Sequence, residues 1–498
     1  MTKPSYSHLN HKNAPKQYLR RNATMATYWK HTMRSLLAGF AVLVAVGSFA
    51  HAADLKLPFI PGQDQGIFLL ISDLHFDPFA SSDVVKRLNA ASPSRWGAIL
   101  DQSKKIAFSQ YGNDANYPLM MSMIEAAKSL TVDYDFILFP GDYIAHHFDT
   151  RYQQVVGGSA AQYAVFVENA IRFINQSFGH AFPKIPFISA LGNNDALCGD
   201  YRIAPNSPLL NRIRAPLELH SGAPGKFKNF AIGGFYAMPH PTVPDREIIV
   251  LNNILWSCKY EDKCNPNGGD PGSAQIAWLE WTLYRLQQKG KTATLVMHVP
   301  PGVNAYTTAQ NAVPGHADCK ENIQLFWADK YARQFQALVE KYPGILDHGF
   351  VGHTHMDDFR VVFGANQHPL LFTRISPAVS PIFDNNPAFT VVLYDRKTDK
   401  LLDYAVYALT NLTQAGISEP GRWALEYSFQ AAYHLDGITP TTLAALSNAV
   451  GQDGDAMQKY VVYYAVGTSS GIDSHIKAYQ CSQRYISVEE YADCYCGK

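Results

Sequence analysis

Charged side chains are scarce in this chain: Asp, Glu, Lys and Arg together make up 17% of its 498 residues, whereas 47% are hydrophobic. This composition excludes a disordered acidic or basic protein, because such chains combine few apolar residues with many charges of one sign. The length is sufficient for one large hydrophobic core or for two or three domains. The sequence therefore predicts a globular protein.

Acidic residues are absent from residues 1–52, a segment that contains seven Lys or Arg residues. Without that segment, 35 basic residues stand against 42 acidic ones, a net charge of about −7. A general affinity for nucleic acid usually requires a basic face. We therefore expect no nucleic-acid partner for the remaining chain.

Long apolar runs are absent apart from one near the N-terminus. Lys30 and Arg34 flank the start of an uncharged run over 35–49, and Ala50-His51-Ala52 follows in the small-x-small pattern that signal peptidase cleaves. The run is shorter than the ~20 residues of a membrane-spanning helix. We expect 1–52 to be an N-terminal extension with a signal peptide, and the mature chain to be secreted or periplasmic with no stable membrane span. An uncleaved N-terminal anchor is the alternative.

Cysteine is also sparse, and its odd count leaves at least one thiol unpaired within the chain. Export favours disulfide bonds over zinc binding, because Cys494-x-Cys496 has no second ligand pair at a suitable spacing. Cys258 and Cys264 would close a short loop, and Cys481 could pair with Cys494 or Cys496. The seven cysteines are Cys198, Cys258, Cys264, Cys319, Cys481, Cys494 and Cys496.

Short apolar runs, each followed directly by glycine or polar residues, alternate with helical patterns along the middle of the chain. Runs this short and this rich in Ile, Val, Leu and Phe indicate buried strands. We expect strands at 66–72, 134–139, 185–191, 293–297 and 345–351, and helices at 159–178, 270–286 and 321–342. This alternation predicts an α/β layered fold, in which chemistry lies at the carboxyl ends of strands.

The composition changes after about residue 395. Residues 396–498 are rich in Tyr and Ala, contain three of the cysteines and have no polar cluster after an apolar run. We therefore expect a catalytic domain over 53–395 and a smaller, mostly helical C-terminal region over 396–498.

The expected strand ends supply seven candidate metal ligands. Two carboxylates, one amide and four imidazoles suit two divalent cations such as zinc, manganese or iron, with one carboxylate as a bridge. Two such ions can lower the pKa of a bound water towards ~7 and stabilise both oxygens of an in-line displacement, as phosphoester hydrolysis requires. A single Gly-Asp usually marks only a turn. Five polar motifs, each directly after an apolar run, would rarely occur in one chain by chance. The seven residues are Asp73, His75, Asp142, Asn193, His298, His353 and His355.

The series Asp-x-His, Gly-Asp, Gly-Asn-x-Asp, His and Gly-His-x-His resembles that of the calcineurin-like metallophosphoesterases. Further segments resemble the acid sphingomyelinase-like phosphodiesterase branch in its short form, without a saposin domain. These segments are Gly141-Asp-Tyr-Ile-Ala-His146, His298-Val-Pro-Pro-Gly302 and Ser376-Pro-Ala-Val-Ser-Pro381. The resemblance covers roughly residues 66–395.

The resemblance implies a four-layer α-β-β-α sandwich and two divalent metal ions, expected to be zinc. It assigns Asp142 to both ions as the bridge. The first ion would also have Asp73, His75 and His355 as ligands, and the second Asn193, His298 and His353.

The resemblance also implies a catalytic role for His146, which lies four residues after Asp142 where the branch keeps a histidine near the substrate phosphate. We expect it to stabilise the transition state or protonate the leaving oxygen. Asn194 departs from the family pattern, in which a histidine there protonates the leaving group with an acidic partner, here retained as Asp195. Because an amide delivers no proton, either His146 is the only acid or the leaving group needs little protonation.

These residues predict an exported enzyme that hydrolyses phosphodiester or phosphoanhydride bonds of small molecules, of nucleotide or phosphocholine type, by metal-activated hydroxide. Sphingomyelin hydrolysis with release of phosphocholine is the alternative, in which the substrate group is a phospholipid headgroup. An exported binding protein with a structural metal site is the alternative from another class. The oligomeric state does not follow from the sequence.

Overall fold

The computed structural model describes residues 55–103, 106–263, 269–452 and 454–497. The expected N-terminal extension and signal peptide at 1–52 lie outside the described residues. Among those that are described, no helix is both long enough and apolar enough to cross a membrane.

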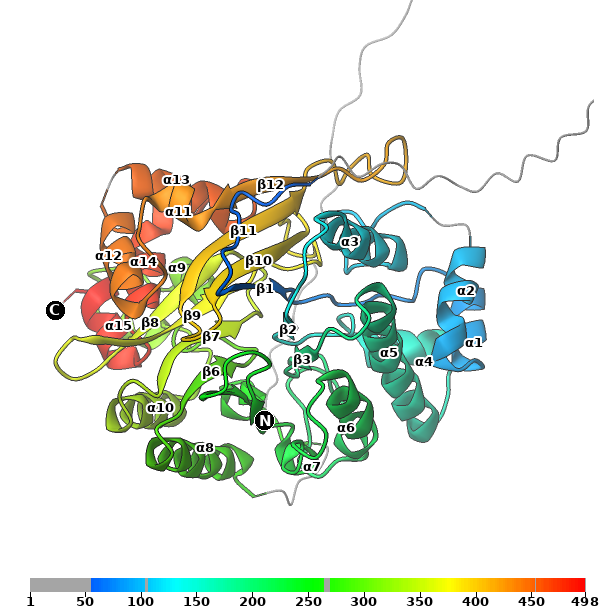
Figure 1. Cartoon of the computed structure of the whole chain (residues 1–498), viewed down its shortest axis with the longest axis horizontal. Coiled ribbons are helices and arrows are strands. Elements are labelled where there is room, and N and C mark those ends of the chain that lie inside the picture. Colours follow the sequence, from blue (N-terminus) through cyan, green and yellow to red (C-terminus); the bar gives the residue numbers. More distant parts are fainter. Residues whose placement is uncertain (1–54, 104–105, 264–268, 453, 498) are drawn as a thin grey trace, which may run out of the picture. The chain divides into compact units, whose positions relative to one another are not determined.

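The described strands form two six-stranded sheets (Figure 1). The first runs in the order β12 (Trp423–Ser428), β11 (Leu401–Leu409), β10 (Ala388–Asp395), β1 (Gln65–Leu70), β2 (Ile137–Phe139) and β3 (Phe187–Ser189). The second runs β4 (Tyr236–Pro239), β5 (Arg246–Val250), β6 (Thr292–Val296), β7 (Leu346–Val351), β9 (Pro369–Ile375) and β8 (Asp358–Phe363). Parallel pairing joins β1 to β2 to β3, and likewise β5 to β6 to β7 to β9.

Aromatic side chains pack the two sheets against each other. Phe68 of β1 stacks on Phe136 with ring centroids 4.7 Å apart and meets Phe350 of β7 edge-on at 5.4 Å. All three rings are buried. This shared apolar layer fixes the position of the two sheets relative to each other, and with it the position of their strand ends.

Helices cover the outer face of each sheet. On the first sheet pack α3 (Tyr117–Ser129), α5 (Ala160–Ala181) and α6 (Pro208–His220); on the second pack α8 (Pro271–Gln288), α10 (Asp329–Lys341), α12 (Pro440–Val450) and α14 (Ile476–Arg484). This confirms the predicted four-layer α/β sandwich. The other described α-helices are α1 (Ser82–Asn89), α2 (Trp96–Gln102), α4 (Phe148–Val155), α7 (Phe230–Gly233), α9 (Ala305–Asn311), α11 (Phe429–Tyr433), α13 (Asp455–Tyr464) and α15 (Val488–Tyr495).

The helices α5 and α8 begin at the capping residues from which the sequence predicts them to start. The Ser159 hydroxyl accepts from the Gln162 backbone, and the Gln162 side chain accepts from the Ser159 backbone, a capping box that starts α5. Asp270 accepts from the Ser273 N–H at the start of α8.

The helix predicted over 321–342 is wrong in its first part. Helix α10 begins only at Asp329, because the segment before it pairs with other loops instead of coiling. The Phe326 N–H donates to the Gly302 carbonyl at 2.8 Å, and Leu325 and Trp327 form isolated bridges to Val303 and Ser257. Backbone groups paired in this way are not available to a helix.

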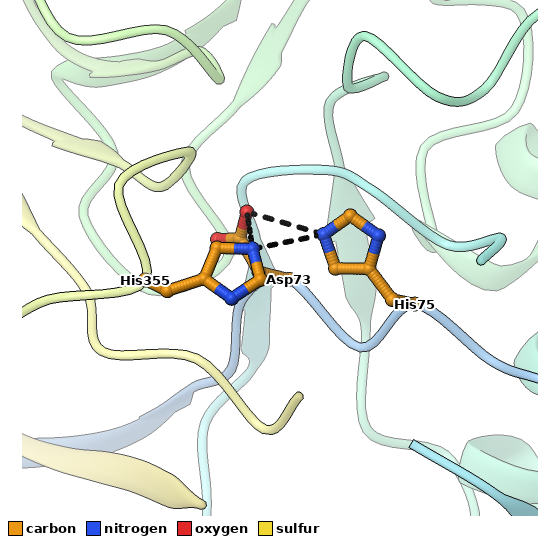
Figure 2. Close-up of side chains that lie close together, drawn as sticks. All are labelled: Asp73, His75 and His355. Atoms are coloured by element: carbon orange, nitrogen blue, oxygen red, sulfur yellow. Dashed lines mark hydrogen bonds and ion pairs between the residues drawn. The ribbon is translucent and has the colours of Figure 1, made fainter. Parts of the chain in front are cut away.

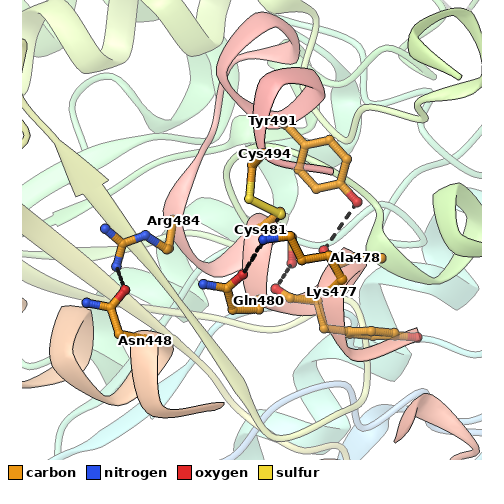
Figure 3. The surroundings of a disulfide bond; sticks show 10 residues. Asn448, Lys477, Ala478, Gln480, Cys481, Arg484, Tyr491 and Cys494 are labelled. Carbon is orange, nitrogen blue, oxygen red and sulfur yellow. Dashed lines mark hydrogen bonds between the residues drawn. A yellow bond between two sulfur atoms is a disulfide. The ribbon is translucent and has the colours of Figure 1, made fainter. Parts of the chain in front are cut away.

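The C-terminal region begins with strands β11 and β12 of the first sheet, and the described part continues with the five helices α11 to α15. A disulfide between Cys481 and Cys494 joins α14 to α15 (Figure 3). A second one, Cys319–Cys496, ties the segment that follows α9 to the residue that follows α15. Because this second bridge joins cysteines 177 residues apart, it restricts the unfolded chain and stabilises the fold.

The pairing expected between Cys258 and Cys264 is wrong. Cys258 is a free, exposed thiol whose Sγ donates to the Leu325 carbonyl at 2.7 Å. Cys264 lies outside the described residues, and Cys198 is disulfide-bonded.

Candidate active site

Five strand ends converge and bring the seven predicted metal ligands together. Asp73 and His75 follow β1, Asp142 follows β2 and Asn193 follows β3. From the second sheet, His298 follows β6, and His353 and His355 follow β7. Because parallel strands present their carboxyl ends at one edge of a sheet, two facing sheets gather these loops at one place.

The backbone at this place is unusual for residues with side chains. Asp73, His75, Asp142, His353 and His355 all have positive φ, between 44° and 74°. Left-handed backbone at a residue other than glycine costs roughly 1–3 kcal/mol and clusters at functional sites. The loops are therefore shaped to aim side chains inward at some cost in stability.

The first ligand group consists of Asp73, His75 and His355, all buried (Figure 2). The two Nε2 atoms lie 3.0 Å apart, and those of His355 and His75 lie 3.5 Å and 3.8 Å from Asp73 Oδ1. At most one proton fits between two imidazole nitrogens at this distance. The converging lone pairs therefore fit a cation, and the donor types suit zinc or a similar divalent metal.

The second ligand group is centred on the Asn193 side-chain oxygen. This Oδ1 lies 2.9 Å from His298 Nε2 and 2.8 Å from His353 Nδ1. Asp142 connects the two groups, because its Oδ2 lies 3.2 Å from His298 Nε2 and 3.3 Å from His75 Nε2. The carboxylate expected to bridge two ions thus lies between both sets of ligands.

Hydrogen bonds behind the second group fix the orientation of its side chains. Asn193 Nδ2 donates to Asp200 at 2.6 Å, and His298 Nδ1 lies 3.1 Å from the Pro140 carbonyl oxygen. Tyr201 places its hydroxyl 3.0 Å from His353 Nε2. Such outer contacts decide which atom of each ligand faces inward.

Burial and neighbouring charges shift the pKa values of the carboxylates and imidazoles in this site. Burial by itself raises the pKa of Asp142, but His298 and His75 beside it hold that pKa well below its usual range. Burial likewise lowers the pKa of both imidazoles, but the carboxylates around them, Asp142 foremost and Asp73 with it, together more than reverse this and raise each pKa to about 9. Positive charge is therefore favoured between these groups, which is what a bound divalent cation supplies.

His146 lies beside the first ligand group, with its ring stacked on that of His75 at a centroid distance of 4.3 Å. Asp114 holds it by two contacts: Oδ1 lies 2.9 Å from His146 Nδ1, and Oδ2 accepts from the His146 backbone N–H at 2.8 Å. The imidazole keeps 22% of its side-chain surface exposed. Its Nε2 edge is thus the part available to a substrate.

Asn194 and Asp195 both act on Asp142. Asn194 donates from its backbone N–H to Asp142 Oδ1 at 2.8 Å and from Nδ2 to Oδ2 at 3.0 Å. Asp195 is fully buried and accepts backbone N–H groups from Gly192, Asp142 and Tyr143 at 2.8–3.1 Å. Burial and the nearby Asp142 raise the pKa of Asp195 to about 7. Asp195 therefore shapes the turn that carries Asp142.

The sequence pattern does not single out three residues of this site, Asp114, Asp200 and Tyr201. None follows directly on an apolar run, so strand-end placement does not select them. Asp114 meets His146 across 32 residues, and Tyr201 meets His353 across 152. The only local signal is that Asp200 and Tyr201 lie shortly after the Gly-Asn-x-Asp segment.

Comparison with known proteins identifies the family. Residues 67–357, more than half of the chain, match the model of the calcineurin-like phosphoesterases. The chain belongs to this family. Residues 371–497 match the model of the acid sphingomyelin phosphodiesterase C-terminal region, which confirms the predicted branch. The protein is therefore a phosphoric ester hydrolase, and its family and residue groups imply divalent metal ions.

Curated relatives agree with this placement. Human acid sphingomyelinase-like phosphodiesterase 3b is 27% identical over 86% of this chain and 90% of its own length. Human cyclic GMP-AMP phosphodiesterase SMPDL3A is 27% identical over 90% of each chain. Sphingomyelin phosphodiesterase B of Dictyostelium discoideum is 23% identical over 80% of this chain and 59% of its own.

Proposed function

We propose that this protein is an exported enzyme with two divalent metal ions, zinc in both positions, that hydrolyses phosphodiester or phosphoanhydride bonds of small nucleotide-type or phosphocholine-type molecules. The observation that carries the proposal is the position of Asp142, with Oδ2 within 3.3 Å of a histidine from each ligand group. Export is supported by the apolar run and cleavage pattern before residue 53 and by the disulfides of the C-terminal region.

In this proposal, Asp73, His75 and His355 would hold the first ion, Asn193, His298 and His353 would hold the second, and Asp142 would be shared by both. When bound, the ions supply Lewis acidity towards the phosphoryl oxygens and a water of lowered pKa. Asp195 and Asn194 keep the bridging carboxylate in place, through the turn and through direct hydrogen bonds respectively.

His146 would contact the reacting phosphate. The Asp114 carboxylate accepts the Nδ1 proton, which leaves Nε2 to donate a proton or a hydrogen bond to an oxygen of the substrate. Asp114 is then a positioning residue, because it acts through His146.

Asn194 favours substrates with a weakly basic leaving group. Its amide hydrogen-bonds the bridging carboxylate but has no transferable proton. A phosphate leaving group needs less protonation than the alkoxide of a lipid, so anhydrides such as CDP-choline suit this site best. Sphingomyelin hydrolysis remains the second candidate, favoured by the name of the Dictyostelium relative.

Phosphorus NMR of the purified, zinc-loaded protein tests the proposal. Incubation with CDP-choline and detergent-dispersed sphingomyelin together should release CMP and phosphocholine and leave the lipid intact. Phosphocholine released from lipid alone would instead establish a sphingomyelinase. The Asp142→Asn variant serves as the inactive control, and zinc binding without turnover of either substrate would favour a binding protein.

A further inference from the structure

Phe383 is a large apolar side chain left half exposed beside the proposed metal site. Its exposed fraction is 50%, although its ring lies 4.6 Å from that of His355 and 5.9 Å from that of His146, measured between centroids. Both contacts are edge-on, with interplanar angles of 68° and 79°. An exposed aromatic ring that contacts both a metal-ligand histidine and the expected catalytic histidine offers a surface to whatever binds there.

The turn that carries Phe383 is fixed to the loops of the site. The Asp384 N–H donates to the Pro381 carbonyl at 3.2 Å, and the Ser380 N–H donates to the Asp73 carbonyl at 3.1 Å. Below the turn, the buried Asn385 donates from Nδ2 to the Ser380 carbonyl at 3.1 Å. The turn that carries the ring is therefore held in a defined position relative to the proposed metal ligands.

The surroundings of Phe383 suit a flat heteroaromatic ring better than a lipid chain. Its neighbour Asp384 is exposed, and Asn386, three residues after Phe383, accepts at 2.6 Å from the hydroxyl of Tyr111, whose segment contacts this turn through the Gly112 N–H and the Pro381 carbonyl. A lipid tail needs continuous apolar surface, and a quaternary ammonium is usually bound by several aromatic rings. A nucleobase needs one aromatic face for stacking and polar groups at its edge.

We propose that Phe383 determines specificity by stacking on the nucleobase of a nucleoside phosphate whose phosphate binds at the two ligand groups. The Phe383 ring lies against the imidazole of His355, whose Nε2 belongs to the first ligand group, so the width of one five-membered ring separates Phe383 from the proposed phosphate position. In a nucleotide, one five-membered pentose ring separates the base from the phosphate in the same way. This inference rests on the proposed function and narrows its substrate class to nucleotides.

Calorimetric binding to the zinc-loaded protein tests the stacking directly, with AMP and ribose 5-phosphate as matched probes that differ only in the base. The Phe383→Ala variant should bind AMP roughly 5- to 150-fold more weakly, the range typical of one lost base–aromatic stack, and bind ribose 5-phosphate unchanged. Phe383→Trp should restore AMP binding. Trp281→Ala, which removes a 59% exposed aromatic ring on α8, should change neither.

The outcomes separate this inference from the proposed function. Equal effects of Phe383→Ala on both probes, or no effect on AMP, would overturn stacking while leaving phosphate binding at the site intact. If the wild-type protein binds neither probe and turns over neither substrate in the NMR assay, the stacking and the proposed function both fail.

Discussion

At the scale of single residues, Asn194 stands where the motif of the calcineurin-like phosphoesterases has a histidine. Its side chain is buried beside the proposed metal ligands, where its Nδ2 donates to Asp142 Oδ2 at 3.0 Å. A histidine in its place would offer a transferable proton next to the leaving group. The consequence depends on how basic that leaving group is.

We predict that Asn194→His raises kcat on a substrate with an alkoxide leaving group, such as dispersed sphingomyelin, by at least about 10-fold, because general acid catalysis contributes most to poor leaving groups. The rate on CDP-choline should stay within about 2-fold, since phosphate departs with little protonation. Steady-state kinetics on both substrates measures this. Unchanged rates on sphingomyelin would show that residue 194 has no part in leaving-group chemistry.

At the scale of elements, two glycines allow the ligand loops to pack closely. A Cβ atom at Gly192 would collide with the Asp142 carboxylate and backbone nitrogen, and one at Gly352 would collide with Ser72 and Asp73. The loops after β2 and β3, and after β1 and β7, thus touch through positions without side chains. The ligand geometry depends on this close approach between elements.

Gly192→Ala should therefore displace Asp142, lower the free energy of unfolding by about 1–3 kcal/mol through overpacking, and weaken metal binding. Gly454→Ala, where a Cβ has open space, is the matched control and should leave metal binding unaltered. Denaturant unfolding together with a zinc-binding titration compares the two variants. Full zinc affinity in Gly192→Ala would contradict the importance of this contact.

Sequence reasoning succeeds at this scale where the signal is local. The strand ends and the starts of α5 and α8 follow from apolar runs and capping residues, which act within a few positions. It fails for 323–328, where pairing with distant loops overrides the helical pattern, and for Asp114 and Phe383, whose roles depend on contacts between segments far apart in the chain. The family motif predicts the metal ligands, but it does not predict Asp114 or Phe383, which contact the site from other segments of the chain.

At the scale of the whole molecule, a second and mostly buried charged cluster joins β5 and β7 of the second sheet to the turn between β10 and β11 of the first. His348 Nδ1 lies 2.9 Å from Asp347, its Nε2 lies 3.3 Å from Asp399, and Arg246 contacts both His348 and Asp399 at 3.2 Å and 2.7 Å. Burial lowers the pKa of His348, but Asp347 and Asp399 together raise it above its usual value despite the opposing Arg246. Burial raises the pKa of Asp399, and His348 and its neighbours hold it well below the usual range.

These shifts predict the pH dependence of stability. A raised histidine pKa stabilises the fold fully below the unfolded value of about 6.5, and this contribution is lost as pH rises through the folded value. The lowered pKa of Asp399 adds stability above about pH 4, which is lost in acid. The free energy of unfolding should therefore fall as the pH rises above about 6.5, and His348→Gln should make this fall shallower. Denaturation of the zinc-loaded protein at several pH values tests it; identical slopes for both proteins would exclude His348 as the cause.

The central claim is that two ligand groups share the Asp142 carboxylate and each hold one divalent ion. Measuring metal per chain, by elemental analysis of protein dialysed after zinc loading, tests this most directly. We predict two zinc ions per chain in the wild-type protein and a loss of at least one in Asp142→Asn, with phosphohydrolase activity lost in parallel. A single ion in the fully active wild-type protein, or two ions retained by Asp142→Asn, would contradict the shared carboxylate.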